Sequence, residues 1–170
     1  MIVALTGFMG SGKTTTGRAL SERLGMPFTD LDEAIVERAG KSIPEIFASE
    51  GENVFRDLEV STLRDIVENA EDNLVLALGG GTVMQPEARA ILGEHCFCIY
   101  LKASPETLLE NLSGAGEGRP MLSGASLEER ISNLLSERSA VYENVADCTV
   151  TVDGLSADQA AERILTVCPM

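Results

Sequence analysis

The stretch GFMGSGKTTT, from Gly7 to Thr16, lies one residue after the apolar run IVAL and decides the fold. Its spacing matches the phosphate-binding loop, or Walker A pattern, in which glycines let successive backbone N–H groups turn toward an anion. The helix expected next would start with its electropositive end at the same phosphates. An ordinary glycine-rich turn does not explain why Lys13 and Thr14 follow Gly12 directly. We therefore predict a nucleoside triphosphate site, with Lys13 on the phosphates and Thr14 on Mg²⁺. The predicted nucleotide-binding residues of this loop are Gly10, Ser11, Gly12, Lys13, Thr14 and Thr15.

Composition excludes several other classes of protein. At 170 residues, 44% apolar and 24% charged, the chain has the size and composition of one globular domain. Its net charge of −14 argues against a nucleic-acid partner, which requires a basic surface. No apolar run approaches the roughly twenty residues needed to cross a bilayer, so no membrane partner is predicted. The first apolar run lacks a preceding basic segment and leads into the phosphate loop, which indicates a core strand and a cytoplasmic protein.

The four cysteines predict no metal site. Cys96 and Cys98 flank Phe97 in a strand-like run and would face one way, with only His95 nearby as a further ligand. We expect buried, reduced thiols at all four positions, as is usual in a cytosolic protein. His95 is expected in a loop or at a strand edge, without a catalytic role.

Apolar strand-like runs alternate with helical patterns along the whole chain. Strands are expected at 2–6, near 28, at 73–78, 97–101 and 148–152, with helices between them. This alternation predicts an α/β fold with a five-stranded parallel sheet covered on both faces. In such sheets ligands bind beyond the carboxyl ends of the strands, so the residues that follow each strand become candidates for a site.

Two of these strand ends carry unusual residues. Asp30 and Asp32 follow the second strand, and in an extended segment both carboxylates would face the phosphates. One could hold water on Mg²⁺, while the other accepts a hydrogen bond from a hydroxyl about to be phosphorylated. Helix capping would explain one of the two aspartates but not both. The third strand ends in the glycine turn, Gly79 to Gly81, which suggests close approach of a ligand to backbone N–H groups, with a simple tight turn as the alternative.

Three arginines stand out in an acidic chain. Arg56 has Glu52 and Glu59 within one helical turn, so pairing along a solvated helix surface is the simpler interpretation, as it is for Arg138. Arg119 differs because it lies in the glycine-rich segment 113–124. That segment predicts a mobile lid that would carry Arg119 onto the transferring phosphoryl group.

Taken together, five stretches of this sequence resemble the shikimate kinase family. The resemblance rests on GFMGSGKTTTGRAL, FTDLDEAIVERAGKSIPEIFASEGENVFRDLE, LALGGGTV, GRPML and ERSAVYENVAD, which occur in order over nearly the whole chain. It implies a P-loop nucleoside monophosphate kinase-like fold over residues 1–170, with a substrate-binding region at about 31–61 and the lid at about 113–124. It also implies transfer of the ATP γ-phosphoryl group to the 3-hydroxyl of shikimate, in the pathway to chorismate and aromatic amino acids, by a monomer.

The resemblance also implies roles for single residues. Lys13, Asp32 and Arg119 would be catalytic, and Arg119 would also contact the nucleotide. Thr14 would bind Mg²⁺, and Asp30 would hold it through water. The predicted substrate-binding residues are Asp32, Arg56, Gly79, Gly80, Gly81 and Arg138, with both helix arginines clamping the shikimate carboxylate. One departure is the lack of Lys or Arg in LLENLSG and VTVDGLSAD, where the family often has a basic residue at the adenine.

Two other functions stay open at this point. One is a P-loop kinase of another small hydroxylated acid, such as gluconate, which would share the phosphate loop but not the remaining motifs. The other is a nucleotide-binding protein that transfers no phosphoryl group, which would need ordered switch loops that contact a partner.

Overall fold

A five-stranded parallel sheet forms the centre of the computed structural model, which describes residues 1–71, 73–113 and 126–170. The strand order is β2-β3-β1-β4-β5, and each neighbouring pair is parallel. The strands are β1 (Ile2–Thr6), β2 (Phe28–Asp30), β3 (Leu74–Ala77), β4 (Cys96–Lys102) and β5 (Cys148–Thr151). Both the α/β class and the parallel sheet predicted from the sequence are confirmed.

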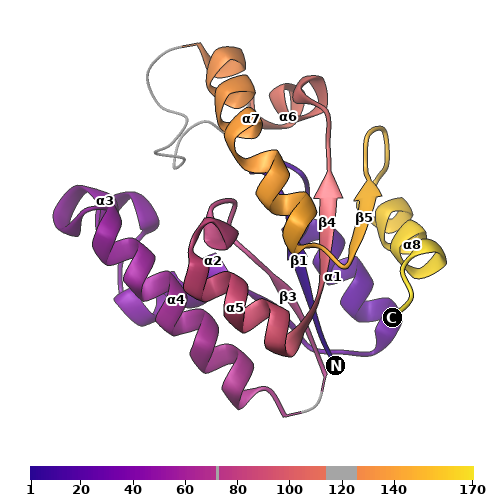
Figure 1. Cartoon of the computed structure of the whole chain (residues 1–170), viewed down its shortest axis with the longest axis horizontal. Helices are drawn as coiled ribbons and strands as arrows, with labels where there is room; N and C mark the ends of the chain where they lie inside the picture. The colour runs from indigo at the N-terminus through magenta and orange to yellow at the C-terminus, as the bar shows by residue number, and fades with distance from the viewer. Residues whose placement is uncertain (72, 114–125) are drawn as a thin grey trace.

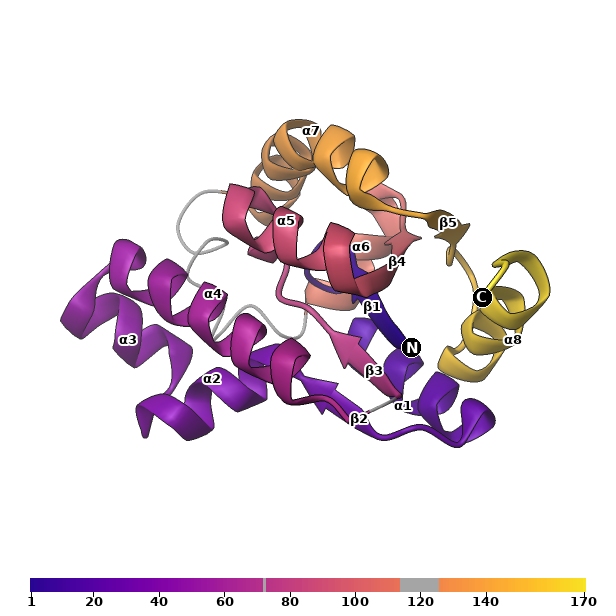
Figure 2. The same ribbon diagram turned by 60° about the horizontal axis from the view of Figure 1, so that its bottom comes forward.

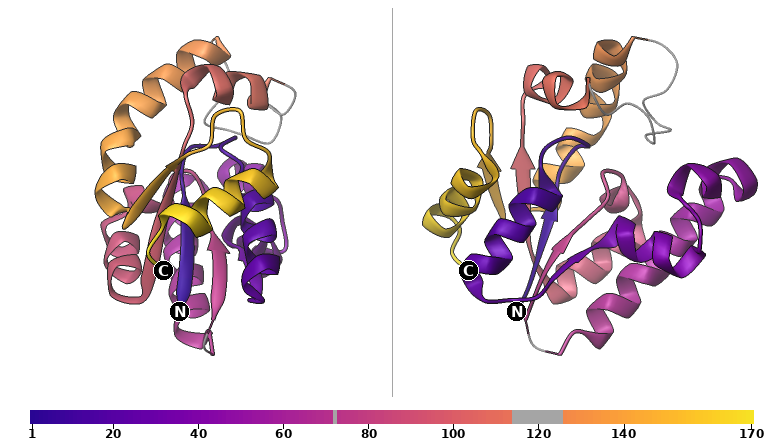
Figure 3. Two further views of the ribbon diagram at one scale, coloured as in Figure 1. Left: turned by 90° about the vertical axis from the view of Figure 1, so that its right-hand side faces the viewer. Right: turned by 180° about the vertical axis from the view of Figure 1, so that it is seen from behind.

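Helices cover both faces of this sheet (Figure 1). The edge-on view shows α1 and α8 on one side and α5 and α7 on the other (Figure 3, left). The helices α2, α3 and α4 lie together beyond β2, at the end of the molecule opposite α8 (Figure 2). Their bounds are α1 (Lys13–Leu24), α2 (Leu31–Ala39), α3 (Ile43–Glu50), α4 (Glu52–Asn69), α5 (Pro86–His95), α6 (Pro105–Leu112), α7 (Leu127–Val145) and α8 (Ala157–Val167), with a short 3-10 helix η1 (Thr82–Met84).

Local sequence accounts for where the elements begin and end. All five residues of β1 are buried, as expected of a central parallel strand that is covered on both faces. Ser104 caps α6 by accepting a hydrogen bond from the Thr107 N–H, and Pro105 occupies its first turn. Gly25 ends α1 in the left-handed conformation, at φ 67°.

The second strand is shorter than the sequence suggested. β2 stops at Asp30, whose Oδ1 accepts a hydrogen bond from the Glu33 N–H and so caps α2. Asp32 therefore lies in the first turn of α2, and the prediction that both aspartates share an extended segment is wrong. His95 is likewise the last residue of α5 rather than a loop or strand-edge residue.

The cysteines differ from the expectation of four reduced thiols. Cys148, the first residue of β5, is joined by a disulfide to Cys168, which directly follows α8. Only Cys96 and Cys98 are free thiols, and burial raises the pKa of each to about 12. The pairing joins residues 20 positions apart whose Cα atoms lie 5.9 Å from each other, a proximity that only the fold reveals. In the described ranges, no helix has both the length and the apolar character needed to cross a membrane.

Candidate active site

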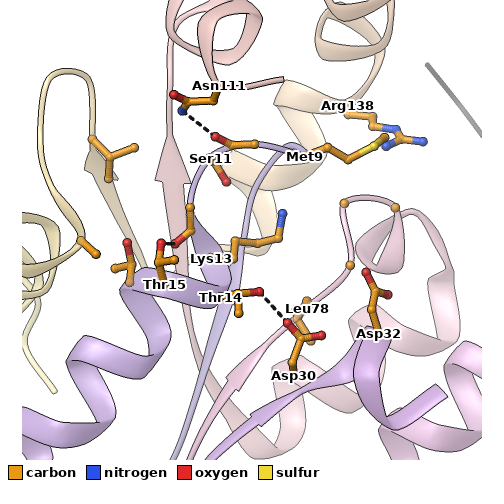
Figure 4. Close-up of a pocket in the computed structure, with 18 of the residues that line it drawn as sticks. Met9, Ser11, Lys13, Thr14, Thr15, Asp30, Asp32, Leu78, Asn111 and Arg138 are labelled. Atoms are coloured by element: carbon orange, nitrogen blue, oxygen red, sulfur yellow. Dashed lines mark hydrogen bonds between the residues drawn. The ribbon is translucent and has the colours of Figure 1, made fainter. Parts of the chain in front are cut away.

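A cavity of about 770 Å³ lies at the carboxyl ends of the strands, where the sheet rule places ligands. The phosphate loop after β1 forms one side of it, and Asp30, at the end of β2, lies beside that loop (Figure 4). The glycine turn after β3 and the helices α4 and α7 line another part. The segment that follows β5, including Val152 and Leu155, lines a third part. The described site residues predicted from the sequence all line this cavity: Gly10, Ser11, Gly12, Lys13, Thr14, Thr15, Asp30, Asp32, Arg56, Gly79, Gly80, Gly81 and Arg138.

The phosphate loop has the geometry of an anion cradle. Gly10 and Gly12 have positive φ angles of 85° and 89°, which side chains with a β-carbon rarely adopt. Gly12 is also the N-cap of α1, and no side chain among the described residues caps this helix. The first N–H groups of α1 therefore point into the cavity from its electropositive end. The Nζ of Lys13 donates hydrogen bonds to the carbonyls of Gly7 (2.7 Å) and Phe8 (3.0 Å), which holds the ammonium across the loop.

Thr14 and Asp30 bring hydroxyl and carboxylate oxygens together beside the loop. The Thr14 Oγ1 donates a hydrogen bond to Oδ2 of Asp30 at 2.5 Å, marked by a dashed line in Figure 4. Within the described ranges, no three His, Cys, Asp or Glu side chains form a group that could hold a metal by themselves. These oxygens fit Mg²⁺, because that ion is usually held by one or two protein oxygens together with substrate phosphates and water.

The three positions of the glycine turn require glycine because neighbouring atoms leave little room for a side chain, and not because of an unusual backbone conformation. None of its three residues is among the glycines with positive φ in the structure. A β-carbon on Gly79 would lie 3.0 Å from Oδ1 of Asp32, and one on Gly81 would lie 2.8 Å from both terminal nitrogens of Arg56. On Gly80 it would lie 3.3 Å from the backbone nitrogen of Met9 and 3.7 Å from Nη1 of Arg138. Side chains of the site therefore approach this backbone directly.

Arg56 is held by a buried carboxylate. Its Nη1 donates to Oε1 of Glu59 at 2.8 Å, and Oε2 of Glu59 accepts a hydrogen bond from the Thr82 hydroxyl at 2.8 Å. Only 1% of Glu59 is exposed. The sequence indicated Glu59 merely as a helix partner of Arg56, because three-residue spacing shows the pairing but not the burial. Glu59 thus joins α4 to η1 and orients the guanidinium toward the glycine turn.

Arg138 is a buried cation whose hydrogen bonds are incomplete. It is 5% exposed, on the side of α7 that faces the cavity, and the solvated helix surface considered for it is wrong. Its Nη1 has no hydrogen-bond partner among the described residues. A buried guanidinium of this kind is costly unless an anion completes its hydrogen bonds, so the space beside this nitrogen and Gly80 is a candidate anion site.

Two further contacts were not predicted from the sequence. The Asn111 Nδ2 donates to the Gly10 carbonyl at 2.8 Å, and a β-carbon on Gly10 would lie 2.8 Å from Cγ of Leu112. The last turn of α6 therefore packs against the phosphate loop. Tyr142 donates a hydrogen bond to the Gly80 carbonyl from α7. Arg119, and all of the predicted lid except Ser113, lie outside the described residues, so that part of the prediction stays a prediction.

Comparison with known proteins agrees with this arrangement. Residues 9–169 match the family model described as shikimate kinase. A shikimate kinase from Thermus thermophilus is 43% identical over 163 residues, 96% of this chain and 87% of that protein. One from Salinibacter ruber is 45% identical over 173 residues, 97% of this chain and 81% of that protein. The solved shikimate kinase from Acinetobacter baumannii, in complex with shikimate, covers 97% of this chain and 90% of its own with 36% identity and a TM-score of 0.92. The chain therefore belongs to the shikimate kinase family, whose members are ATP-dependent phosphotransferases.

Proposed function

We propose that this chain transfers the γ-phosphoryl group of ATP to the 3-hydroxyl of shikimate and releases ADP and shikimate 3-phosphate. The observation that carries the proposal is the buried Nη1 of Arg138, which lacks a hydrogen-bond partner among the described residues and lies beside Gly80. It lies in the same cavity as the phosphate loop, so a bound acid and a bound triphosphate would meet there. Holding both reactants in one cavity converts the transfer into an effectively unimolecular step.

The nucleotide half of the cavity would bind ATP with Mg²⁺. Backbone N–H groups from Gly10 to Thr15 would surround the phosphates, and Lys13 would neutralise charge on the β- and γ-phosphates. Thr14 would bind Mg²⁺ directly and Asp30 through water. When bound, the ion neutralises the charge that develops on the transferring phosphoryl group. Lys13 would exchange its hydrogen bonds to loop carbonyls for contacts with phosphate oxygens.

The acid half would bind the shikimate carboxylate between two arginines. Arg56 and Arg138 approach the glycine turn from α4 and α7, and planar guanidinium groups match a carboxylate with two parallel hydrogen bonds. Backbone N–H groups of the glycine turn would add donors to the same carboxylate. Asp32 would hold the ring hydroxyls and accept the proton of the attacking hydroxyl, from its position beside Gly79.

The two alternative functions have weaker support. A protein that binds nucleotide without transferring a phosphoryl group has no need for a buried guanidinium opposite its phosphate loop. A gluconate kinase also needs a carboxylate site, but the family match over residues 9–169 favours shikimate. We further propose that the chain acts as a monomer in the cytoplasm, as one kinase domain over residues 1–170. Residues 31–61 would then form much of the acid-binding region.

A coupled ADP-release assay tests this function. The parent protein, with ATP and Mg²⁺, is given shikimate, gluconate or no acceptor. We expect rapid ADP release with shikimate alone. Lys13→Ala is the matched control, because it removes the phosphate-neutralising charge and should abolish the shikimate-dependent signal while leaving any contaminating ATPase. Equal ADP release with and without shikimate, or a preference for gluconate, would overturn the proposal.

A further inference from the structure

The two tyrosines of the chain form a stacked pair behind the glycine turn. Tyr100 lies on β4 and Tyr142 on α7, and their ring centroids are 5.2 Å apart with planes inclined by 33°. Both side chains are buried, and Tyr142 is fully so. The Tyr142 hydroxyl donates a hydrogen bond to the Gly80 carbonyl and also lies within hydrogen-bonding reach of the Arg138 guanidinium, whereas the described residues offer the Tyr100 hydroxyl no hydrogen bond. The pair therefore combines a shared packing role with polar contacts that belong to Tyr142 alone.

Tyr142 lies one helical turn after Arg138, so α7 presents both side chains on one face. The hydroxyl of Tyr142 contacts the Gly80 carbonyl, while Nη1 of Arg138 lies 3.7 Å from the position of a β-carbon on Gly80. A single helix thus determines both where the arginine lies and how the Gly80 peptide is oriented. The same β-carbon position lies 3.3 Å from the backbone nitrogen of Met9 in the phosphate loop.

Three consecutive glycines are the most flexible backbone an L-polypeptide offers, because they have no side chains of their own. A hydrogen bond to the Gly80 carbonyl restrains the peptide plane between Gly80 and Gly81, and with it the direction of the Gly81 N–H. Burial raises the pKa of Tyr142, an effect that nearby Arg138 partly offsets, so the hydroxyl keeps its proton and acts as a donor at neutral pH.

We propose that Tyr142 is a positioning residue for the acid substrate: its hydroxyl holds the Gly80 peptide so that the turn and Arg138 form one preorganised carboxylate site. The inference rests on the proposed function, because the acid is the ligand of that site. Tyr142 itself does not contact the substrate. Its contribution is the alignment of the turn's backbone donors with the guanidinium before the acid arrives.

Matched Tyr→Phe variants test this role. Tyr142→Phe keeps the ring stack and removes the hydrogen bond, whereas Tyr100→Phe makes the same chemical change in the same pair without touching Gly80. We expect Tyr142→Phe to raise the KM for shikimate about tenfold, the factor expected for a lost hydrogen bond that orients a binding group. The KM for ATP and kcat should change less than about threefold. Tyr100→Phe should leave all three values within about twofold of the parent.

Fluorescence gives a readout that does not depend on turnover. The chain contains no tryptophan, so Tyr100→Phe leaves Tyr142 as its only strong intrinsic fluorophore, and Tyr142→Phe leaves Tyr100. Shikimate added without ATP should change the tyrosine emission of Tyr100→Phe more than that of Tyr142→Phe. Calorimetry on the same samples establishes that the acid is bound.

The outcomes separate this inference from the proposed function. A parent protein without shikimate-dependent ADP release overturns the function itself. An active parent whose Tyr142→Phe and Tyr100→Phe variants have equal KM values for shikimate overturns only the positioning role. If Tyr142→Phe fails to fold, the Tyr100→Phe protein decides alone: emission unchanged while calorimetry shows bound shikimate would overturn the inference.

Discussion

The hydroxyl of Thr14 donates a hydrogen bond to Oδ2 of Asp30 at 2.5 Å, which joins the first turn of α1 to the end of β2. The other carboxylate oxygen of Asp30 accepts from the Glu33 N–H and caps α2. One side chain therefore supports α2, which belongs to the proposed acid-binding region, and also faces the residue proposed to bind Mg²⁺. An aspartate that caps a helix can therefore also belong to the proposed metal site.

Replacing Asp30 by Asn separates these two tasks. Asparagine caps helices about as well as aspartate, so we expect the melting temperature to stay within a few degrees of the parent value. The loss of charge should raise the Mg²⁺ concentration needed for half-maximal activity severalfold. Asp30→Ala is the comparison, because it loses the cap as well and should also cost about 1 kcal/mol of stability. An unchanged Mg²⁺ requirement in Asp30→Asn would remove Asp30 from the metal site.

The two arginines near the glycine turn should discriminate the acid from the nucleotide. Arg138→Lys and Arg56→Lys keep the positive charge but lose the planar pair of donors, so shikimate should bind at least about tenfold more weakly. ATP affinity should be nearly unchanged. Isothermal titration measures both ligands, and Arg38→Lys is the control because Arg38 pairs with Asp65 on the surface. If both variants retain parental shikimate affinity, the carboxylate clamp is wrong.

A methyl group added to the glycine turn should disturb the site through space alone. In Gly81→Ala the new β-carbon would lie 2.8 Å from both terminal nitrogens of Arg56, so the guanidinium must move. Because a displacement of about 1 Å can cost up to about a hundredfold in rate, we expect kcat/KM for shikimate to fall by at least about tenfold. Steady-state kinetics with each substrate varied in turn measures this loss.

Gly93→Ala is the matched control for that substitution. Gly93 lies within α5, and apart from its chain neighbours and its own helix backbone no atom of the described residues lies within 4 Å of an added β-carbon. Alanine there should stabilise the fold by about 0.5–1 kcal/mol through helix propensity and leave kcat/KM unchanged. Parental kinetics in both variants would mean that the turn does not form part of the acid site.

The disulfide predicts a stability that depends on reductant. Closing a loop between residues 20 positions apart should stabilise the oxidised protein by about 3 kcal/mol relative to Cys168→Ser. Thermal melts with and without reductant should differ for the parent and coincide for the variant. Alkylation of unfolded, unreduced protein should label Cys96 and Cys98 only. Labelling of all four cysteines would contradict the pairing.

The phosphate loop and the sheet could be predicted because both depend on patterns between residues close together in the sequence. The Gly-Lys-Thr spacing after an apolar strand determines the loop geometry locally. The strand at Ile2–Thr6 has the expected bounds, and the helix expected after the loop is α1. Asp30 faces the phosphate loop, as the sequence predicted. The expectation that Asp32 lies in the same extended segment was wrong. The helix that contains Asp32 begins at Leu31, because Asp30 caps this helix and ends the strand two residues before Asp32.

The inward orientation of the remaining site residues could not be predicted from the sequence, because it depends on burial in the folded protein. Arg56 and Arg138 have the spacing of solvated helix charges, and only tertiary packing against the glycine turn turns them inward. The family resemblance raised both to site residues, while the helical pattern alone favoured the surface. Tyr142 carried no signal of its own, because an aromatic residue on an amphipathic helix usually marks core packing. Its hydrogen bond to Gly80 joins residues 62 positions apart.

Identification of the phosphorylated hydroxyl tests the central claim most directly. The parent protein is incubated with ATP, Mg²⁺ and shikimate, and the product is examined by proton–phosphorus correlation NMR. The account predicts one phosphate ester, on the 3-hydroxyl of shikimate, formed in equal amount with ADP and absent with Lys13→Ala. ADP without a phosphate ester, or an ester at another hydroxyl, would contradict it.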